Sequence, residues 1–243
     1  MNSIPLFGVA KVAEICYTIL AAKTNREVRD MSARKSEIVI VGIALLSFVI
    51  GVYYYPQMPE QMASHWNAKG QVDDYLSKFW GLFLIPITLV GLALLFMAVP
   101  RMDPLRENIE KFRRYYDGFV ILFMLFMIVV YLLTILWNTG IKISLNVFLP
   151  IAAGIMFVGV GILVENTRQN WFVGIRTPWT MSSESVWDKT HRMAGKLFKI
   201  AGAIAIVGIL FQSYAVYFVL VPAILVAVYT VAYSYVEYKK ERK

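Results

Sequence analysis

The sequence predicts an all-α fold: a polytopic bundle of six transmembrane helices with both termini in the cytoplasm. Of the 243 residues, 58% are apolar and 16% are charged, with a mean hydropathy of +0.60, whereas soluble domains average about 45–50% apolar and about 25% charged residues. Six apolar stretches approach the length that crosses the hydrocarbon layer, which is roughly 20 residues for a helix. The lysines and arginines between these stretches alternate between dense and sparse loops.

The predicted spans are 38–55, 79–99, 118–136, 145–164, 198–212 and 216–235. The fifth is short, and residues 193–197 can complete it. Lys199, near its start, can extend its ammonium group towards the lipid head groups. Small residues such as Gly154 and Gly202 would let neighbouring helices approach closely.

Cationic side chains resist translocation, so their distribution orients the bundle. The segment before residue 38, the loops 100–117 and 165–196 and the tail after residue 235 hold 20 of the 24 lysines and arginines. The loops 56–78, 137–144 and 213–215 hold three. We therefore expect the first group in the cytoplasm and the second group outside. Membrane orientation accounts for the net charge of +8, so no direct nucleic-acid partner is predicted.

Three parts of the chain are distinguished. Residues 1–37 form a basic, amphipathic segment in which Lys11 and Glu14 argue against a seventh span and favour an interfacial helix. A translation start at Met31 would leave only a short basic leader. Residues 38–99 form the first helix hairpin with the external loop 56–78, and residues 100–243 form the membrane core with the cytoplasmic loop 165–196.

The external loop is predicted to be a compact folded cap that recognises an extracellular molecule. Residues 67–70 favour a turn in which Gly70 takes a positive φ. His65, Trp66 and Asn67 combine aromatic area with directional hydrogen bonding, which is typical of recognition surfaces. The candidate recognition residues are His65, Trp66, Asn67, Gly70, Asp73 and Lys78.

A metal site is the alternative for this loop, because His65, Asp73 and Asp74 are its strongest ligands. Their spacing matches no metal-binding template. We therefore favour structural hydrogen bonding here and assign no metal.

The cytoplasmic loop 165–196 is predicted to be irregular in its first half and helical in its second. Gly174 interrupts it, and Pro178 holds Thr177 out of the α region. Ser182 or Ser183 can then cap a helix. One stripe of that helix is expected to face the bundle or the membrane interface: Trp187, His191, Ala194 and Phe198.

Two residues of this loop have more than one interpretation. The guanidinium of Arg176 needs acceptors near the hydrocarbon boundary, so it either clamps the loop or binds a partner. His191 is better interpreted as a satisfied interfacial histidine than as a ligand or a base. We expect Arg176→Ala to harm function more than Lys189→Ala, because Lys189 falls on the solvated face.

The sequence predicts neither an enzyme nor a cofactor. The predicted spans carry almost no ionisable side chains, whereas ion transporters keep such groups at membrane depth. No catalytic triad, Walker loop, zincin helix or Rossmann fingerprint is present. The alternative functions are a small-solute or lipid transporter, or a membrane enzyme that uses His65 or His191.

Both loops resemble those of the SdpI family, multi-pass immunity proteins that protect producer cells against a secreted killing factor. The cytoplasmic loop resembles the family in the run GIRTPWT and in the residues around it. These are Asn170, Gly174, Ile175, Arg176, Thr177, Pro178, Trp179, Trp187, Thr190, His191 and Gly195. The external loop resembles the small domain of unknown function that often precedes the family core, through Pro56, Pro59, His65, Asn67, Gly70, Asp73 and Lys78.

The resemblance extends from residue 36 to the C-terminus, with 100–243 as the SdpI-like core. It implies a multi-pass cell-membrane protein that confers resistance to a secreted toxin peptide or protein. In the best-understood member, the protein also senses the toxin and retains a soluble transcriptional repressor at the membrane. The implied partners are the lipid bilayer, a secreted toxin and, as a further step, a cytosolic repressor.

Overall fold

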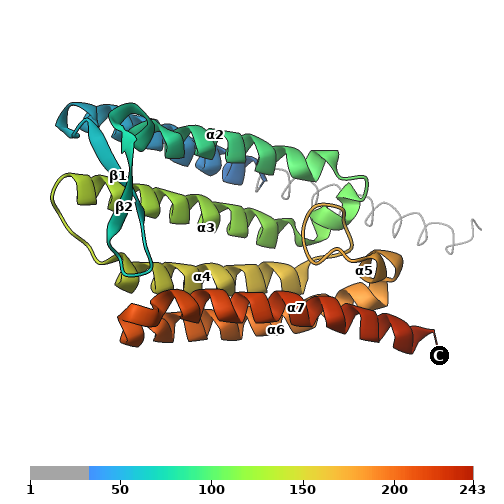
Figure 1. Ribbon diagram of the computed structural model, residues 1–243. Helices are drawn as coiled ribbons and strands as arrows, with labels where there is room; N and C mark the ends of the chain where they lie inside the picture. Colours follow the sequence, from blue (N-terminus) through green and yellow to red (C-terminus); the bar gives the residue numbers. More distant parts are fainter. Residues whose placement is uncertain (1–32, 243) are drawn as a thin grey trace, which may run out of the picture. The chain divides into compact units, whose positions relative to one another are not determined.

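The computed structural model describes residues 33–242, so the predictions for the amphipathic segment and for a start at Met31 lie outside the described residues. The chain divides into two compact units, Met1–Ile38 and Val39–Lys243. The second unit contains the elements discussed below. Long helices dominate it (Figure 1), which confirms the predicted all-α bundle.

The first described helix ends at Tyr54. It is followed by η1 (Tyr55–Gln57), β1 (Gln61–Trp66), β2 (Val72–Ser77), α2 (Lys78–Met102), α3 (Arg106–Asn138), α4 (Leu145–Asn166), α5 (Pro178–Ser182), α6 (Glu184–Val207), η2 (Gly208–Tyr214) and α7 (Ala215–Glu241).

Within the described residues, five helical stretches are long and apolar enough to cross a bilayer. The last of them, Glu184–Glu241, contains α6, η2 and α7 and so covers two of the predicted spans. The chain reverses at η2, where Phe211 has a non-helical φ of −125° and ψ of 58°. As a result α6 and α7 lie side by side (Figure 1). The count of six membrane crossings stays a prediction. It requires that α6 and α7 each cross the bilayer.

Helix α3 begins at Arg106, well before the predicted span 118–136. Helix α6 begins at Glu184 with Ser183 as its N-cap, which confirms the predicted helix start, and the predicted span 198–212 covers only its later part. In the added turns of α3, Arg113 forms ion pairs with Asp117 at 2.7 Å and with Glu110 at 3.3 Å. Such i,i+3 and i,i+4 pairs support a helix outside the hydrocarbon layer. A criterion based on apolar length detects only the membrane-depth part of each helix.

Glycines let α4 and α6 pack backbone to backbone. A Cβ atom on Gly202 would lie 2.6 Å from the carbonyl oxygen of Gly154, and one on Gly195 would lie 2.8 Å from that of Gly161. Even one added methyl group would therefore collide with the facing backbone. The predicted role of Gly154 and Gly202 in close helix approach is confirmed.

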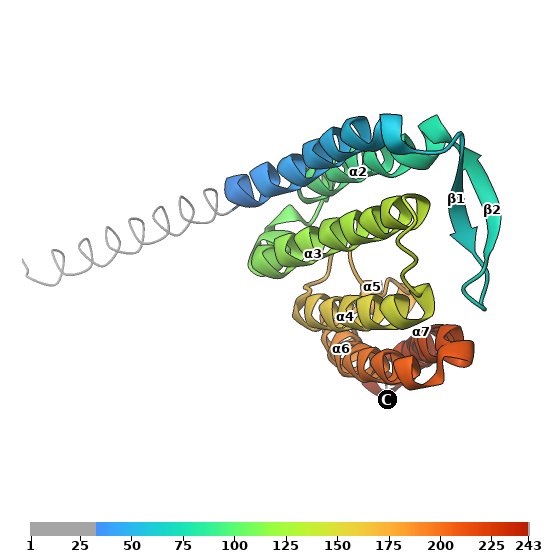
Figure 2. The ribbon, with the colours of Figure 1, turned by 90° about the vertical axis from the view of Figure 1, so that its left-hand side faces the viewer.

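The loop 56–78, which is predicted to be external, forms an antiparallel β-hairpin that was not predicted from the sequence. Its register pairs Gln61 with Ser77 and Trp66 with Val72. Met62 of β1 is fully buried, and its side chain packs in one cluster with Leu82 and Tyr131. Figure 2 shows the hairpin leaving the end of α2 and passing α3 towards α4. The hairpin and α5 lie at opposite ends of the long helices (Figure 1).

Candidate functional site

The tip of the hairpin is the predicted turn. The side-chain oxygen of Asn67 accepts hydrogen bonds from the backbone N–H groups of Lys69 at 2.9 Å and of Gln71 at 3.1 Å. Gly70 has a φ of +73°, a left-handed conformation that side chains with a Cβ rarely adopt. Asn67 and Gly70 therefore build the turn, which confirms this part of the prediction.

The hairpin is docked on the end of α3 through Asn138. The amide of Asn138 accepts from the N–H of Ala63 at 2.8 Å and donates to the carbonyl of Ala63 at 3.1 Å. This pairing satisfies both backbone groups of a buried residue. Trp66 adds an edge-to-face contact with Trp137, with 5.6 Å between ring centroids.

Polar groups of the predicted recognition residues pair within the hairpin. Nδ1 of His65 lies 2.6 Å from Oδ1 of Asp73, and Lys78 pairs with Glu60 at 2.7 Å. Asp74 instead accepts from the N–H of Tyr75. His65 and Asp73 therefore form the expected structural hydrogen bond, and Asp74 does not join them. No group of three potential metal ligands occurs within residues 33–242.

A pocket of about 400 Å³ lies between the hairpin tip and the adjacent ends of α4 and α7. His65, Trp66 and Asn67 line it on the hairpin side, whereas Gly70, Asp73 and Lys78 do not. The remaining lining is mostly apolar and includes Val219 of α7. The part of the lining that α7 contributes was not predicted. Nothing in the sequence distinguishes apolar residues that line a pocket from apolar residues that face lipid.

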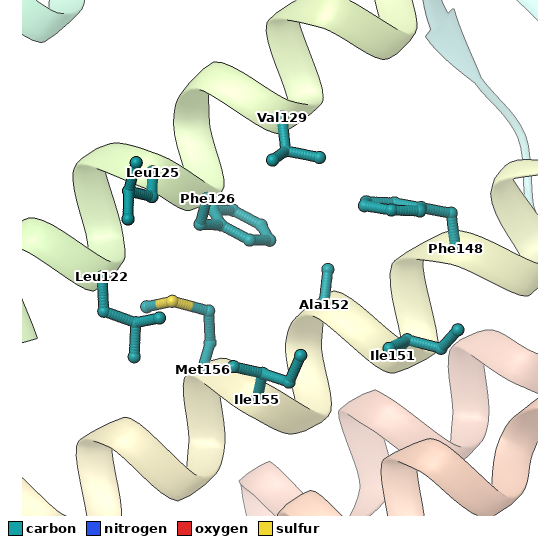
Figure 3. A pocket seen from close by; sticks show the side chains of 9 residues that line it. All are labelled: Leu122, Leu125, Phe126, Val129, Phe148, Ile151, Ala152, Ile155 and Met156. Carbon is teal, nitrogen blue, oxygen red and sulfur yellow. The ribbon is translucent and has the colours of Figure 1, made fainter. Parts of the chain in front are cut away.

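A second pocket, of about 200 Å³, lies between α3 and α4, and its lining is wholly apolar (Figure 3). Val129 and Phe148 belong to its lining (Figure 3), and Phe126 lines both pockets. At Gly159 the two helices are close, because a Cβ atom there would collide with the side chain of Leu122.

At the opposite helix ends, Asn170 organises the loop 165–196, which is predicted to be cytoplasmic and is called the cytoplasmic loop below. This side chain is fully buried. Its amide nitrogen donates to the carbonyls of Arg168 and Val173, and its oxygen accepts from the N–H groups of Phe172 and Val173. Four hydrogen bonds to loop backbone explain why an asparagine stands at this position.

His191 holds the next part of the loop against α6. Its Nε2 accepts from the N–H of Ile175 at 2.9 Å, and its Nδ1 lies 2.8 Å from the carbonyl of Trp187. The ring stacks on Trp187 with 3.9 Å between centroids. His191 lies in the turns of α6 that precede the predicted span, where burial lowers its pKa to about 4. It is a satisfied histidine, as predicted.

The GIRTPWT run, residues 174–180, leads into α5 and contacts α7 through its side chains. Thr177 caps α5 in a reciprocal capping box with Thr180, and its hydroxyl lies 3.1 Å from that of Ser234. The ring of Trp179 packs 5.0 Å from the ring of Tyr235. The guanidinium of the exposed Arg176 donates to the carbonyl of Trp171. This contact within the loop favours the interpretation of Arg176 as a clamp. Thr190 is fully buried.

Contacts that were not predicted from the sequence tie this loop to α2 and α3. Asp103, only 2% exposed, accepts from the N–H of Trp171 at 2.9 Å and from that of Leu105 at 2.7 Å. Asn108 donates to the carbonyl of Gln169 at 2.8 Å. The sequence gives one indication of these contacts, the carboxylate of Asp103 at the end of an apolar span. A carboxylate in that position is indistinguishable from an ordinary loop residue.

Comparison with known proteins matches both loops. Residues 42–90 match the model of a domain of unknown function, DUF1648, and residues 166–234 match the model of the SdpI/YfhL protein family. The chain is 26% identical over 207 residues to Immunity protein SdpI of Bacillus subtilis (strain 168), which covers 85% of this chain and 97% of the relative. The resemblance to the SdpI family is confirmed. No solved structure matches the chain.

The SdpI/YfhL region contains the cytoplasmic loop, α5, α6 and most of α7, and the DUF1648 region contains the hairpin. The pocket at the hairpin tip is lined by residues of both regions, such as Trp66 and Val219. These matches show that the chain is similar to the SdpI family, and together with the apolar helices they support a multi-pass cell-membrane protein.

Proposed function

We propose that this chain is an integral membrane immunity protein that protects its cell against a secreted toxin. The observation that carries the proposal is the similarity to Immunity protein SdpI, which extends over 97% of that relative. The similarity therefore takes in both the hairpin end and the cytoplasmic loop, rather than a single shared helix.

The layout of the chain supports toxin contact at the hairpin. The distribution of lysine and arginine predicts that this end faces outwards, and His65, Trp66 and Asn67 line its pocket. A secreted toxin would meet this end of the molecule first.

Sensing is a further part of the proposal, because α7 reaches from the pocket to the cytoplasmic loop. Val219 lines the pocket, Ser234 contacts Thr177, and Glu241 accepts from Ser183 at 2.7 Å. A toxin that binds one arrangement of α7 more tightly would shift the loop. Trp171 and Phe172, 51% and 41% exposed, would then be the surface that retains a cytosolic repressor.

Transport has less support, because hydroxyls within the helices bond to their own backbone. Thr88 donates to the carbonyl of Leu84, Thr134 to that of Val130 and Ser47 to that of Ala44. These hydroxyl groups are satisfied within their own helices and give no indication of a polar path.

The test is survival. The full chain is expressed in a host that is sensitive to the secreted toxin encoded beside its gene, and an empty vector serves as the control. We expect cells with the chain in their membranes to survive toxin concentrations that kill control cells. Equal killing at a verified membrane level would overturn the proposal.

Sensing has a separate test. Membranes from these cells are solubilised with and without the toxin, and the soluble proteins retained by the chain are identified. We expect a DNA-binding protein that is retained only with the toxin. The same retained proteins in both samples would overturn sensing and leave immunity intact.

A further inference from the structure

The pocket at the hairpin tip is lined mostly by apolar residues, together with a few polar ones. Leu149 and Val219 are among the apolar residues, from α4 and α7, and Asn67 and Asn146 are among the polar ones. We propose that this pocket binds an apolar segment of the toxin polypeptide. The proposal rests on the proposed immunity function and names the site at which the toxin is held.

One donor in the pocket lining lacks an acceptor. Within the described residues, the indole Nε1 of Trp66 is buried and has no hydrogen-bond partner. An unsatisfied buried donor raises the free energy of the unbound protein. If the indole turns towards the pocket when a peptide binds, a backbone carbonyl of that peptide satisfies this donor, and the gain exists only in the complex.

The charges around the pocket favour a peptide over a phospholipid. The lining contains neither lysine nor arginine, the residues that usually bind phosphate. Its one ionisable side chain, His65, is paired with the carboxylate of Asp73. An uncharged segment with apolar side chains and backbone carbonyls matches this surface, whereas an anionic head group does not.

The wall of the pocket explains how a bound segment would influence the whole chain. The hairpin contributes Trp66 and Asn67, and α7 contributes residues from Ala215 to Leu220. The first group belongs to the DUF1648 region and the second to the SdpI/YfhL region. A segment bound in the pocket would contact both regions at once, and neither region alone forms the whole lining.

Filling the pocket is the first test. Val219→Trp places a large ring in the pocket, and Val221→Trp is the matched control, because Val221 is 48% exposed on the same helix and does not line the pocket. We expect Val219→Trp to lower the toxin concentration that kills half of the cells by about tenfold, the factor for one lost set of apolar contacts. Val221→Trp should protect as the wild type does. Ala153→Phe, which fills the pocket from α4, repeats the test if the first variant is missing from the membrane.

The indole N–H is the second test, and it separates binding from folding. Trp66→Phe removes the unpaired donor, so we expect unchanged or higher thermal stability of the free chain together with about threefold to tenfold weaker toxin binding in nanodiscs. Trp80→Phe in α2 is the control, because Trp80 is exposed and does not line the pocket. Equal loss of stability and binding in Trp66→Phe would contradict the assigned role of its N–H.

A photo-crosslinking amino acid at position 219 identifies the occupant directly. In membranes exposed to the toxin, we expect an adduct with the mass of a toxin fragment, and in membranes without toxin no such adduct. An adduct with lipid that persists at saturating toxin would overturn the proposal.

These outcomes distinguish failure of the pocket as the toxin site from failure of the immunity function. If the wild type protects cells and Val219→Trp and Ala153→Phe protect equally well, the pocket is not the toxin site although the chain is an immunity protein. If the wild type gives no protection, the proposed function fails, and the assignment of the pocket to a toxin fails with it.

Discussion

Gly174 and His191 are so close that no side chain fits between them. A Cβ atom on Gly174 would lie 2.5 Å from Nε2 of His191, the atom that accepts the hydrogen bond from the N–H of Ile175. Gly174 also has a φ of +118°. The hydrogen bond from Ile175 to His191 holds the loop on α6, and a side chain at position 174 would displace the ring that accepts it.

Gly174→Ala is therefore expected to destabilise the protein strongly. Gly140→Ala is the matched control, because Gly140 also has a positive φ, +101°, but within the described residues a Cβ atom there would meet nothing closer than 4 Å. Both variants strain the backbone by about 1–2 kcal/mol, and overpacking adds about 1–3 kcal/mol only at Gly174. Thermal unfolding of the full chain in detergent measures the difference. Equal melting temperatures for the two variants would contradict this account.

The burial of His191 predicts a loss of stability in acid. Its pKa is lowered to about 4 in the fold, against an ordinary value of 6.5, so the unfolded chain binds more protons in between. The contribution of the neutral ring is complete above about pH 6.5 and falls as the pH drops towards 4, by roughly 2 kcal/mol at pH 5. Melting temperatures at pH 7.5 and pH 5 measure it.

The same measurement on two variants assigns this effect. His191→Phe should lose part of the acid sensitivity, whereas His65→Gln should retain it, because His65 is exposed. If His65→Gln alone removes the sensitivity, His191 is not its source.

Asn138 is predicted to hold the hairpin in place. Asn138→Leu leaves the N–H and the carbonyl of the buried Ala63 without their partner, at about 1–3 kcal/mol for each unsatisfied group. Asn166→Leu is the control, because the exposed amide of Asn166 bonds only to its own helix in the described structure. Amide hydrogen exchange across residues 61–77 should accelerate in Asn138→Leu alone. Unchanged exchange there would show that the hairpin is held by other contacts.

Arg176→Ala remains expected to harm protection more than Lys189→Ala, with a revised reason. Arg176 donates to the carbonyl of Trp171 and so closes the loop. Lys189 is not simply solvated, because it lies 3.3 Å from the buried carboxylate of Glu237, but Lys240 pairs with the same carboxylate at 2.6 Å. Lys240 compensates for Lys189→Ala, and nothing equivalent is seen at Arg176 within the described residues. Survival assays at equal membrane levels compare the two, and equal protection would remove the reason for singling out Arg176.

The sequence was sufficient for the positions of the apolar helices, for the turn at the hairpin tip and for the buried stripe of α6. Apolar length locates the spans because the bilayer imposes it, and Asn67 with Gly70 predicts the turn because few residues adopt its backbone angles. The buried stripe of Trp187, His191 and Ala194 follows from helical periodicity. In each case the physical constraint acts over a few neighbouring residues.

What could not be predicted depends on contacts between distant residues. Asn138 reaches Ala63, and Asp103 reaches Trp171, across more than sixty positions of the chain, so neither partner reveals the other in one sequence. The hairpin strands are short and polar, so their alternation gives no clear period. The pocket arises only where the hairpin meets α4 and α7, which periodicity within one element cannot indicate.

The orientation of the two helix ends is the central claim, and cysteine labelling in intact cells tests it most directly. Cys16→Ser removes the one native cysteine, and Lys69→Cys or Ser182→Cys then introduces a single thiol at an exposed position of the hairpin or the cytoplasmic loop. A membrane-impermeant maleimide is expected to label position 69 in intact cells and position 182 only after lysis. Labelling of position 182 in intact cells, with position 69 protected, would contradict the account.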